Sequence, residues 1–295
     1  MISDITLGQF FPGYSVLHKL DPRTKIIIAL IAIIAVFFAN NPASFAFMII
    51  ATAILIAVSR ISFSVVLKGI KPLVVILIFT AILNMFMTAG EGAPLFEFWI
   101  IKIYKEGIAR AIFMALRVII LIVITSMLLT YTTSPIALTD ALESLLSPLK
   151  KLRVPVHTFA MMMSIALRFI PTLVEETEKI MNAQKSRGAD FSSGSLIKRA
   201  KALIPILIPL IVSSFKRADE LATAMECRCY RGDKNRTKLV KLEYKGRDFV
   251  WLLLGVLFIG AVVVLSVLPY STGIASGGAY ASPLSDILKL IFYKV

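Results

Sequence analysis

The chain has 295 residues, of which 58% are hydrophobic and only 17% are charged, and its formal net charge is +14 at pH 7. A mean hydropathy of +0.84 excludes an ordinary soluble domain. Long apolar runs predict an all-α polytopic membrane protein instead, because a helix satisfies its own backbone hydrogen bonds inside a bilayer.

The apolar runs, taken in chain order, predict about five transmembrane helices. A helix needs about 20 mainly apolar residues to cross a bilayer. Residues 26–59 carry no charge and are interrupted at Asn40-Asn41-Pro42, which predicts two short spans joined by a tight turn. The other three predicted spans are 72–89, 107–131 and 249–270.

The distribution of Lys and Arg predicts how these spans are oriented, since cytoplasmic loops carry the excess of positive charge. Basic residues precede the first span and separate the second from the third, whereas the turn at 39–42 carries none. Residues 134–248 hold 20 of the 32 Lys and Arg but 12 of the 18 Asp and Glu. We therefore expect a cell-membrane protein whose N-terminus and residues 134–248 are cytoplasmic and whose C-terminus is outside. Basic residues beside apolar runs favour lipid headgroups over nucleic acid as partners.

This pattern divides the chain into three predicted parts. Residues 1–133 form an N-terminal membrane domain with about four spans, residues 134–248 form a cytoplasmic or interfacial helical region, and residues 249–295 form the last span and a tail. The middle region begins with an amphipathic helix, on which Asp140 and Glu143 are expected to be solvated.

Two further helices are predicted in the middle region. The first passes through Pro171 and can end at Gly188, where glycine adopts the left-handed conformation that closes a helix. Residues 202–215 are apolar but too short to span and return, so we expect an elbow at the membrane interface. The second helix follows this elbow and is predicted to end near Gly232.

Two Arg-Gly pairs lie at the ends of these helices, 44 residues apart, but the preceding helices align better at an offset of 41. Each Arg could simply close a helix, because a cation there offsets the helix dipole. Two matched arginines also fit protruding groups that bond to carboxylates or carbonyls of a partner. The matched positions are Ala183 with Ala224, Ser186 with Cys227, Arg187 with Arg228 and Gly188 with Cys229, and the second set is followed by Tyr230, Arg231 and Gly232.

Other polar residues give few signs of chemistry. Arg117 lies roughly ten residues into the fourth predicted span, where an arginine should face protein, so we expect a structural partner for it. Cys227 and Cys229 are expected to be reduced thiols, because they lie in the predicted cytoplasmic region. No metal is expected there, because zinc needs four ligands and His18 and His157 are distant in the sequence. Catalytic and nucleotide-binding motifs are absent from the sequence. We expect no enzymatic activity, metal or cofactor.

Five blocks of the sequence resemble the transmembrane T component of energy-coupling factor (ECF) transporters, which are bacterial and archaeal importers of vitamins and transition metals. The resemblance runs in order from about residue 8 to about residue 245. The blocks are PGYSVLHKLDPRTK at 12–25, TTSPIALTDALESLL at 132–146, MMMSIALRFIPTLVEE at 161–176, AQKSRGADF at 183–191 and RADELATAMECRCYRG at 217–232.

The resemblance implies a non-catalytic coupling function. In this family the T component joins two cytosolic ABC ATPases, identical or homologous, to a substrate-binding membrane subunit, the S component. Two coupling helices each end in an Ala-Arg-Gly motif that docks in a groove of one ATPase, and ATP is bound only by the ATPases. By position, the first motif is Ser186-Arg187-Gly188 and the second is Cys227-Arg228-Cys229. Ser186 therefore stands in place of Ala, and Cys227 and Cys229 stand in place of Ala and Gly.

Two other classes of function stay open at the level of the sequence. One is a conventional ABC importer permease that binds its own substrate between its spans. The other is a polytopic lipid-processing enzyme that uses the basic middle region to hold a phosphorylated lipid.

Overall fold

The computed structural model describes residues 10–87, 96–98, 101–189, 191, 195–232 and 242–267. These residues form two compact units. The insert unit lies within Pro135–Lys241, and the membrane unit lies within Phe10–Ser134 and Leu242–Val295. The insert unit therefore interrupts the membrane unit along the chain.

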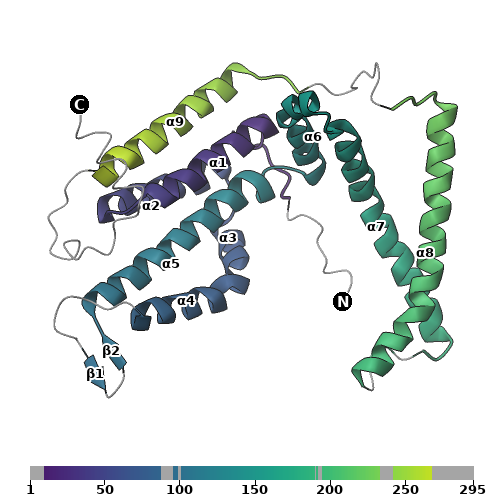
Figure 1. Ribbon diagram of the computed structural model, residues 1–295, viewed down its shortest axis with the longest axis horizontal. Helices are drawn as coiled ribbons and strands as arrows, with labels where there is room; N and C mark the ends of the chain where they lie inside the picture. Colours follow the sequence, from purple (N-terminus) through teal and green to yellow (C-terminus); the bar gives the residue numbers. More distant parts are fainter. Residues whose placement is uncertain are drawn as a thin grey trace. The chain divides into compact units, whose positions relative to one another are not determined.

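Most of the described chain is helical, and one hairpin is the only sheet within it (Figure 1). In the membrane unit the elements are α1 (Pro22–Phe38), α2 (Pro42–Ser59), α3 (Phe63–Ile70), η1 (Lys71–Leu73), α4 (Val74–Met87), β1 (Phe96–Phe98), β2 (Ile101–Ile103), α5 (Lys105–Thr125), η2 (Ser126–Tyr131) and α9 (Gly246–Val267). In the insert unit they are α6 (Pro135–Leu145), η3 (Ser147–Leu152), α7 (Val156–Ser186) and α8 (Leu196–Cys227).

Local sequence fixes where the first two helices begin. Helix α1 begins with Pro22 behind the capping residue Asp21, and α2 begins with Pro42 behind Asn41. Proline suits the first helical turn because no hydrogen-bond partner is needed for its nitrogen there. The break between the two helices confirms the predicted division of residues 26–59.

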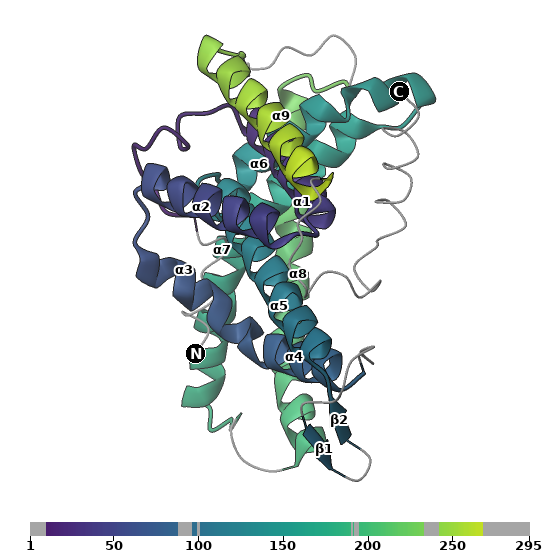
Figure 2. The same cartoon turned by 90° about the vertical axis from the view of Figure 1, so that its left-hand side faces the viewer.

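The core of the membrane unit lies where α1 packs against α9 and α5, with α2 beside them (Figure 2). Three alanines of α1 and the residue that caps its end recur at intervals of three or four residues and are buried there: Ala29, Ala32, Ala35 and Ala39. Such small residues let helix backbones approach closely, which matters in a membrane because lipid is as apolar as the helices. Aromatic rings add contacts between helices, as with Phe45 and Phe113, whose centroids lie 5.0 Å apart.

Two polar side chains connect helix ends in this unit. Asn41 Nδ2 donates to the carbonyl oxygens of Leu265 at 3.2 Å and Ser266 at 3.0 Å, at the end of α9. Arg117 Nη2 donates to the carbonyl oxygen of Ala39 at 2.6 Å. The Arg117 guanidinium thus contacts the carbonyl that follows α1, which the helix itself leaves without a partner.

Five described helical segments are long and apolar enough to cross a membrane: Pro42–Ser59, Phe63–Met87, Gly107–Tyr131, Val156–Ser186 and Gly246–Val267. The predicted class, an all-α polytopic membrane protein, is confirmed. This set differs from the five predicted spans in one member. Helix α1 is not among the five, because its 17 residues are only about 26 Å long, and α7, which was not predicted as a span, is long enough to be included. Helix α7 is the least apolar, with a mean hydropathy of 1.3 against 2.1 to 2.8 for the others. The cytoplasmic location of residues 134–248 stays a prediction.

The third predicted span, 72–89, begins earlier than expected and is bent. Helices α3 and α4 are joined by the 3-10 turn η1, which contains Pro72, and Figure 1 shows a sharp change of direction between them. Proline supplies no backbone N–H, which accounts for the break in the helix. Helix α4 alone has 14 residues, or about 21 Å, so the segment reaches spanning length only together with α3.

A short hairpin, which the sequence analysis did not predict, precedes α5. Strands β1 and β2 are antiparallel, with Phe96 opposite Ile103 and Phe98 opposite Ile101.

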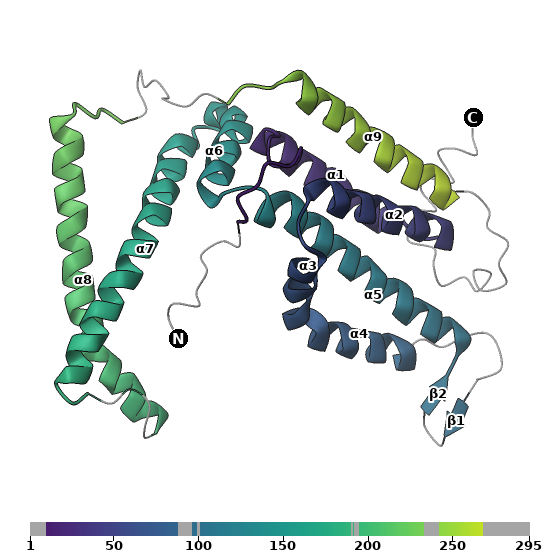
Figure 3. The same cartoon turned by 180° about the vertical axis from the view of Figure 1, so that it is seen from behind.

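The insert unit is dominated by α7 and α8, which have 31 and 32 residues and run in opposite directions (Figure 3). Helix α7 continues through Pro171, as predicted. The predicted elbow at 202–215 is wrong, because α8 is one helix that contains both Pro205 and Pro209. Each proline removes one backbone hydrogen bond and bends the helix without ending it, and Figure 1 shows α8 bent.

The expected exposure of Glu143 is also wrong. Its Oε1 lies 2.9 Å from His157 Nδ1, and the two side chains are 9% and 7% exposed. Helix α7 folds back on α6 and supplies the polar partner that a buried carboxylate needs. Asp140, on the same helix, is half-buried.

Candidate functional site

The C-terminal end of α7 forms a closed backbone motif around Arg187. The Arg187 N–H donates to the carbonyl oxygens of Ala183 and Gln184, at 3.3 and 3.1 Å. The Gly188 N–H donates to the carbonyl oxygen of Lys185 at 2.9 Å, and the Ala189 N–H donates to that of Gln184 at 3.0 Å. Gly188 has φ of 86°, so this is a Schellman end with glycine in the left-handed position. The predicted helix end at Gly188 is confirmed.

The C-terminal end of α8 repeats this motif around Arg228. The Arg228 N–H donates to the carbonyl oxygens of Ala224 and Met225, at 3.3 and 3.1 Å. The Cys229 N–H donates to the carbonyl oxygen of Glu226 at 2.8 Å, and the Tyr230 N–H donates to that of Met225 at 3.0 Å. Cys229 itself takes the left-handed position, with φ of 58°.

The prediction that Gly232 ends α8 is therefore wrong. Helix α8 ends at Cys227, and Gly232, with φ of 76°, lies in a later turn together with the exposed Arg231. A short side chain adopts the left-handed conformation at a cost of roughly 1–2 kcal/mol, which the repeated hydrogen bonds offset at Cys229. The offset of 41 thus pairs Arg187 with Arg228, which occupy equivalent backbone positions, and it does not pair the two Arg-Gly dipeptides.

Both arginines project from exposed helix ends with small neighbours. Arg187 and Arg228 are exposed, and each follows the last residue of its helix. The neighbouring positions are also exposed: Ala183, Ser186, Gly188, Ala224, Cys227 and Cys229. A guanidinium offers five N–H donors in a planar fork, so each end can bind a carboxylate or several carbonyl oxygens of a partner.

The two ends are held apart by the crossing of α7 and α8. Arg217 Nη2 donates to Glu176 Oε2 at 2.8 Å, and these residues are themselves 41 positions apart. Arg187 lies 11 residues beyond Glu176 and Arg228 lies 11 residues beyond Arg217, which is about 16 Å along each helix. Because the helices run in opposite directions (Figure 3), the two motifs are two separate sites.

Comparison with known proteins decides the family. Residues 13–239 match the CbiQ family, described as cobalt transport protein. The energy-coupling factor transporter transmembrane protein EcfT of Clostridium kluyveri is 55% identical over 250 residues, covering 85% of this chain and 92% of the relative. EcfT of Ruminiclostridium cellulolyticum is 52% identical over 265 residues (90% and 98% of the two chains), and EcfT of Bacillus subtilis is 49% identical over 248 residues (84% and 93%). The chain belongs to the family of ECF transporter T components.

For this T component, the structure assigns the predicted site residues to three places. Ser186, Arg187 and Gly188 lie at the end of α7, and their counterparts lie at the end of α8. Arg117 lies in the membrane unit and takes no part in either motif. The docking role of these residues stays a prediction.

Sequence reasoning on this T component missed Glu176 and Arg217. The same offset of 41 that matches Arg187 with Arg228 also matches Glu176 with Arg217, an acid with a base. A search for opposite charges at matched positions would have found this pair. In the part of the chain that the structure describes, no three His, Cys, Asp or Glu side chains lie together as metal ligands.

Proposed function

We propose that this T component is the scaffold and energy-coupling subunit of an ECF-type ABC importer. The observation that carries the proposal is the repeated Schellman end of α7 and α8, which presents Arg187 and Arg228 from two separate exposed positions. Two equivalent donors at the ends of two crossed helices suit two ATPase subunits of similar or identical surface.

The proposed mechanism is mechanical. ATP binding and hydrolysis in the two ATPases displace the ends of α7 and α8, and the membrane unit reorients an S component that carries the cargo, a vitamin or a transition metal. The chain is then a non-catalytic subunit that needs no cofactor, since its partners bind ATP. The names of the EcfT relatives and the cobalt transport description of the matching family support this proposal.

The docking step is tested by reversing both charges. Arg187→Glu with Arg228→Glu should weaken co-purification of the ATPases by about 100-fold or more, since each charged hydrogen bond contributes about 1.5–3 kcal/mol. The matched control is Lys179→Glu with Lys216→Glu, which reverses two exposed charges on the same helices. The proposal is wrong if the arginine variant binds the ATPases and supports uptake as the control does. Saturable cargo binding to the T component alone would point to a permease instead.

The native cysteines give an independent measurement of docking. Cys227 and Cys229 are the two cysteines of the sequence, and both are exposed beside Arg228. Bound ATPase should slow their labelling by a maleimide, whereas addition of a non-cognate ATPase should not. Equal labelling rates with and without the ATPases would contradict docking at α8.

A further inference from the structure

The insert unit joins the membrane unit through two chain connections, one after Ser134 and one before Leu242. The first connection follows Thr132 and Thr133, at the end of η2. The second leads through Lys245 into α9. Both connections lie on the covalent path from α7 and α8 to the membrane unit.

The start of α1 holds the first connection. Lys25 Nζ donates to the carbonyl oxygen of Thr132 at 2.7 Å and to Thr133 Oγ1 at 3.3 Å. Lys25 is 1% exposed, and both threonines are also buried. Lys25 precedes the apolar run 26–38. Burial lowers the pKa of Lys25 to about 8, while the carboxylates of Asp21 and Asp248 act in the opposite direction.

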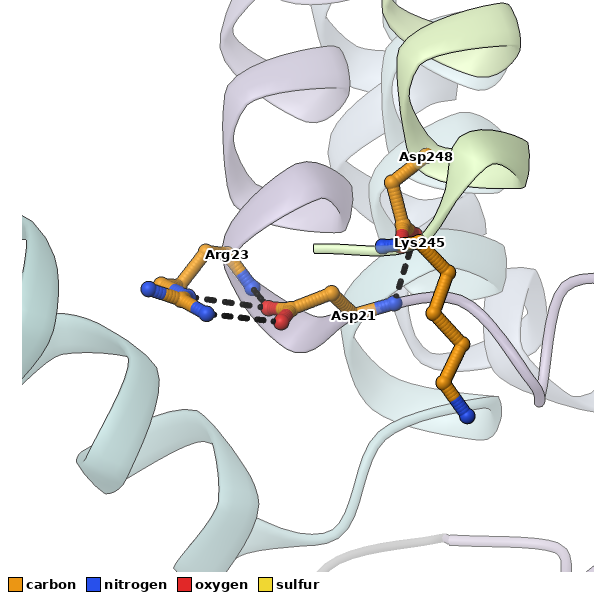
Figure 4. A network of polar contacts seen from close by, with 4 residues as sticks. All are labelled: Asp21, Arg23, Lys245 and Asp248. Carbon is orange, nitrogen blue, oxygen red and sulfur yellow. Dashed lines mark hydrogen bonds and ion pairs between the residues drawn. The ribbon is translucent and has the colours of Figure 1, made fainter. Parts of the chain in front are cut away.

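The same turn of α1 holds the second connection (Figure 4). Asp248, 2% exposed, accepts the backbone N–H of Asp21 on Oδ1 at 2.9 Å and that of Lys245 on Oδ2 at 2.8 Å. Asp21 in turn accepts from the Arg23 guanidinium at 3.0 and 3.2 Å. The Arg23 guanidinium also lies 4.1 Å from the ring centroid of Tyr244, in the connection itself.

We propose that residues 21–25 anchor both connections of the insert unit, and that Lys25 and Asp248 are positioning residues for energy coupling. The inference rests on the proposed function. Buried charged groups hold their partners in one geometry, because leaving such a group without a partner is costly. Displacement of the insert unit would therefore act on α1, η2 and α9 together, as through one rigid element.

The anchor is tested first on the full chain alone, by hydrogen–deuterium exchange. Lys25→Met should raise exchange at residues 132–134 at least tenfold, because the variant loses both charged hydrogen bonds of Lys25. Asp248→Asn should raise exchange at 20–21 and 244–246, because an amide has only one oxygen for the two N–H groups. The matched control, Lys68→Met, removes an exposed cation and should change neither region. Unchanged exchange in both buried variants would overturn the anchor.

The coupling role is tested in proteoliposomes that hold the T component, both ATPases and an S component with which the wild-type chain supports uptake. Lys25→Met and Asp248→Asn should retain the ATPases and hydrolyse ATP near the wild-type rate, while uptake of the radiolabelled cargo of that S component per ATP falls about tenfold. Uptake per ATP equal to that of the wild type would overturn the inference, as would a parallel loss of assembly, hydrolysis and uptake. If the wild-type chain itself binds no ATPase, the proposed function fails, and the exchange experiment still decides whether the anchor exists.

Discussion

The ends of α7 and α8 have the same backbone but different residues at the left-handed position. Gly188 occupies it in α7 and Cys229 in α8, while the hydrogen-bond pattern is repeated donor for donor. The comparison teaches that the backbone shape, with an arginine immediately before the left-handed residue, is the shared feature. Glycine is the easier residue for this position and is not required there.

The largest expected effect comes from breaking one motif at a time. If the two ends are equivalent docking sites, Arg187→Glu and Arg228→Glu should each weaken ATPase binding by about tenfold to a hundredfold, from 1.5–3 kcal/mol of charged hydrogen bonding. Arg→Lys at either position should give a smaller loss, because an ammonium lacks the planar fork of donors. Surface-immobilised T component and titrated ATPase would give the affinities. A loss confined to one of the two single variants would show that the ends are not equivalent.

A smaller effect is expected from exchanging the residues at the left-handed position. Gly188→Ala should destabilise the end of α7 by about 1 kcal/mol, because a Cβ disfavours positive φ. Cys229→Gly should stabilise the end of α8 by a few tenths of a kcal/mol, since relief of strain is partly offset by the greater flexibility of glycine in the unfolded chain. Exchange rates of the last-turn amides would report both changes. Equal effects of the same sign would contradict the conformational explanation.

The smallest effect is expected at the crossing of the two helices. Glu176→Gln or Arg217→Met should change stability by only about 0.2–1 kcal/mol, because the side chains are 28% and 35% exposed and solvent screens the pair. Combining the two substitutions should cost little more than either alone. A thermal unfolding series of the two single variants and the double variant provides this cycle, and a strictly additive double variant would show that the ion pair contributes nothing.

The sequence predicted the membrane class, the break at 40–42 and the end of α7, because apolar runs, prolines and glycine act through local geometry. Its predictions were wrong at two places in α8, where local propensity did not decide the structure. Pro205 and Pro209 favoured an elbow, yet α8 continues and packs against α7. Gly232 was the better helix terminator by propensity, yet the helix ends at Cys227.

The sequence by itself determined that the chain is apolar enough to span a membrane, and that two arginines recur at an offset of 41 after similar helices. Both properties follow from composition and from helical periodicity, which can be read from the sequence without knowledge of any long-range contact. Only the tertiary structure decided that Glu176 pairs with Arg217 and that the start of α1 binds the segments around Thr132 and Asp248. Those contacts join residues far apart in the sequence, so only the packing of the helices decides which polar groups become partners.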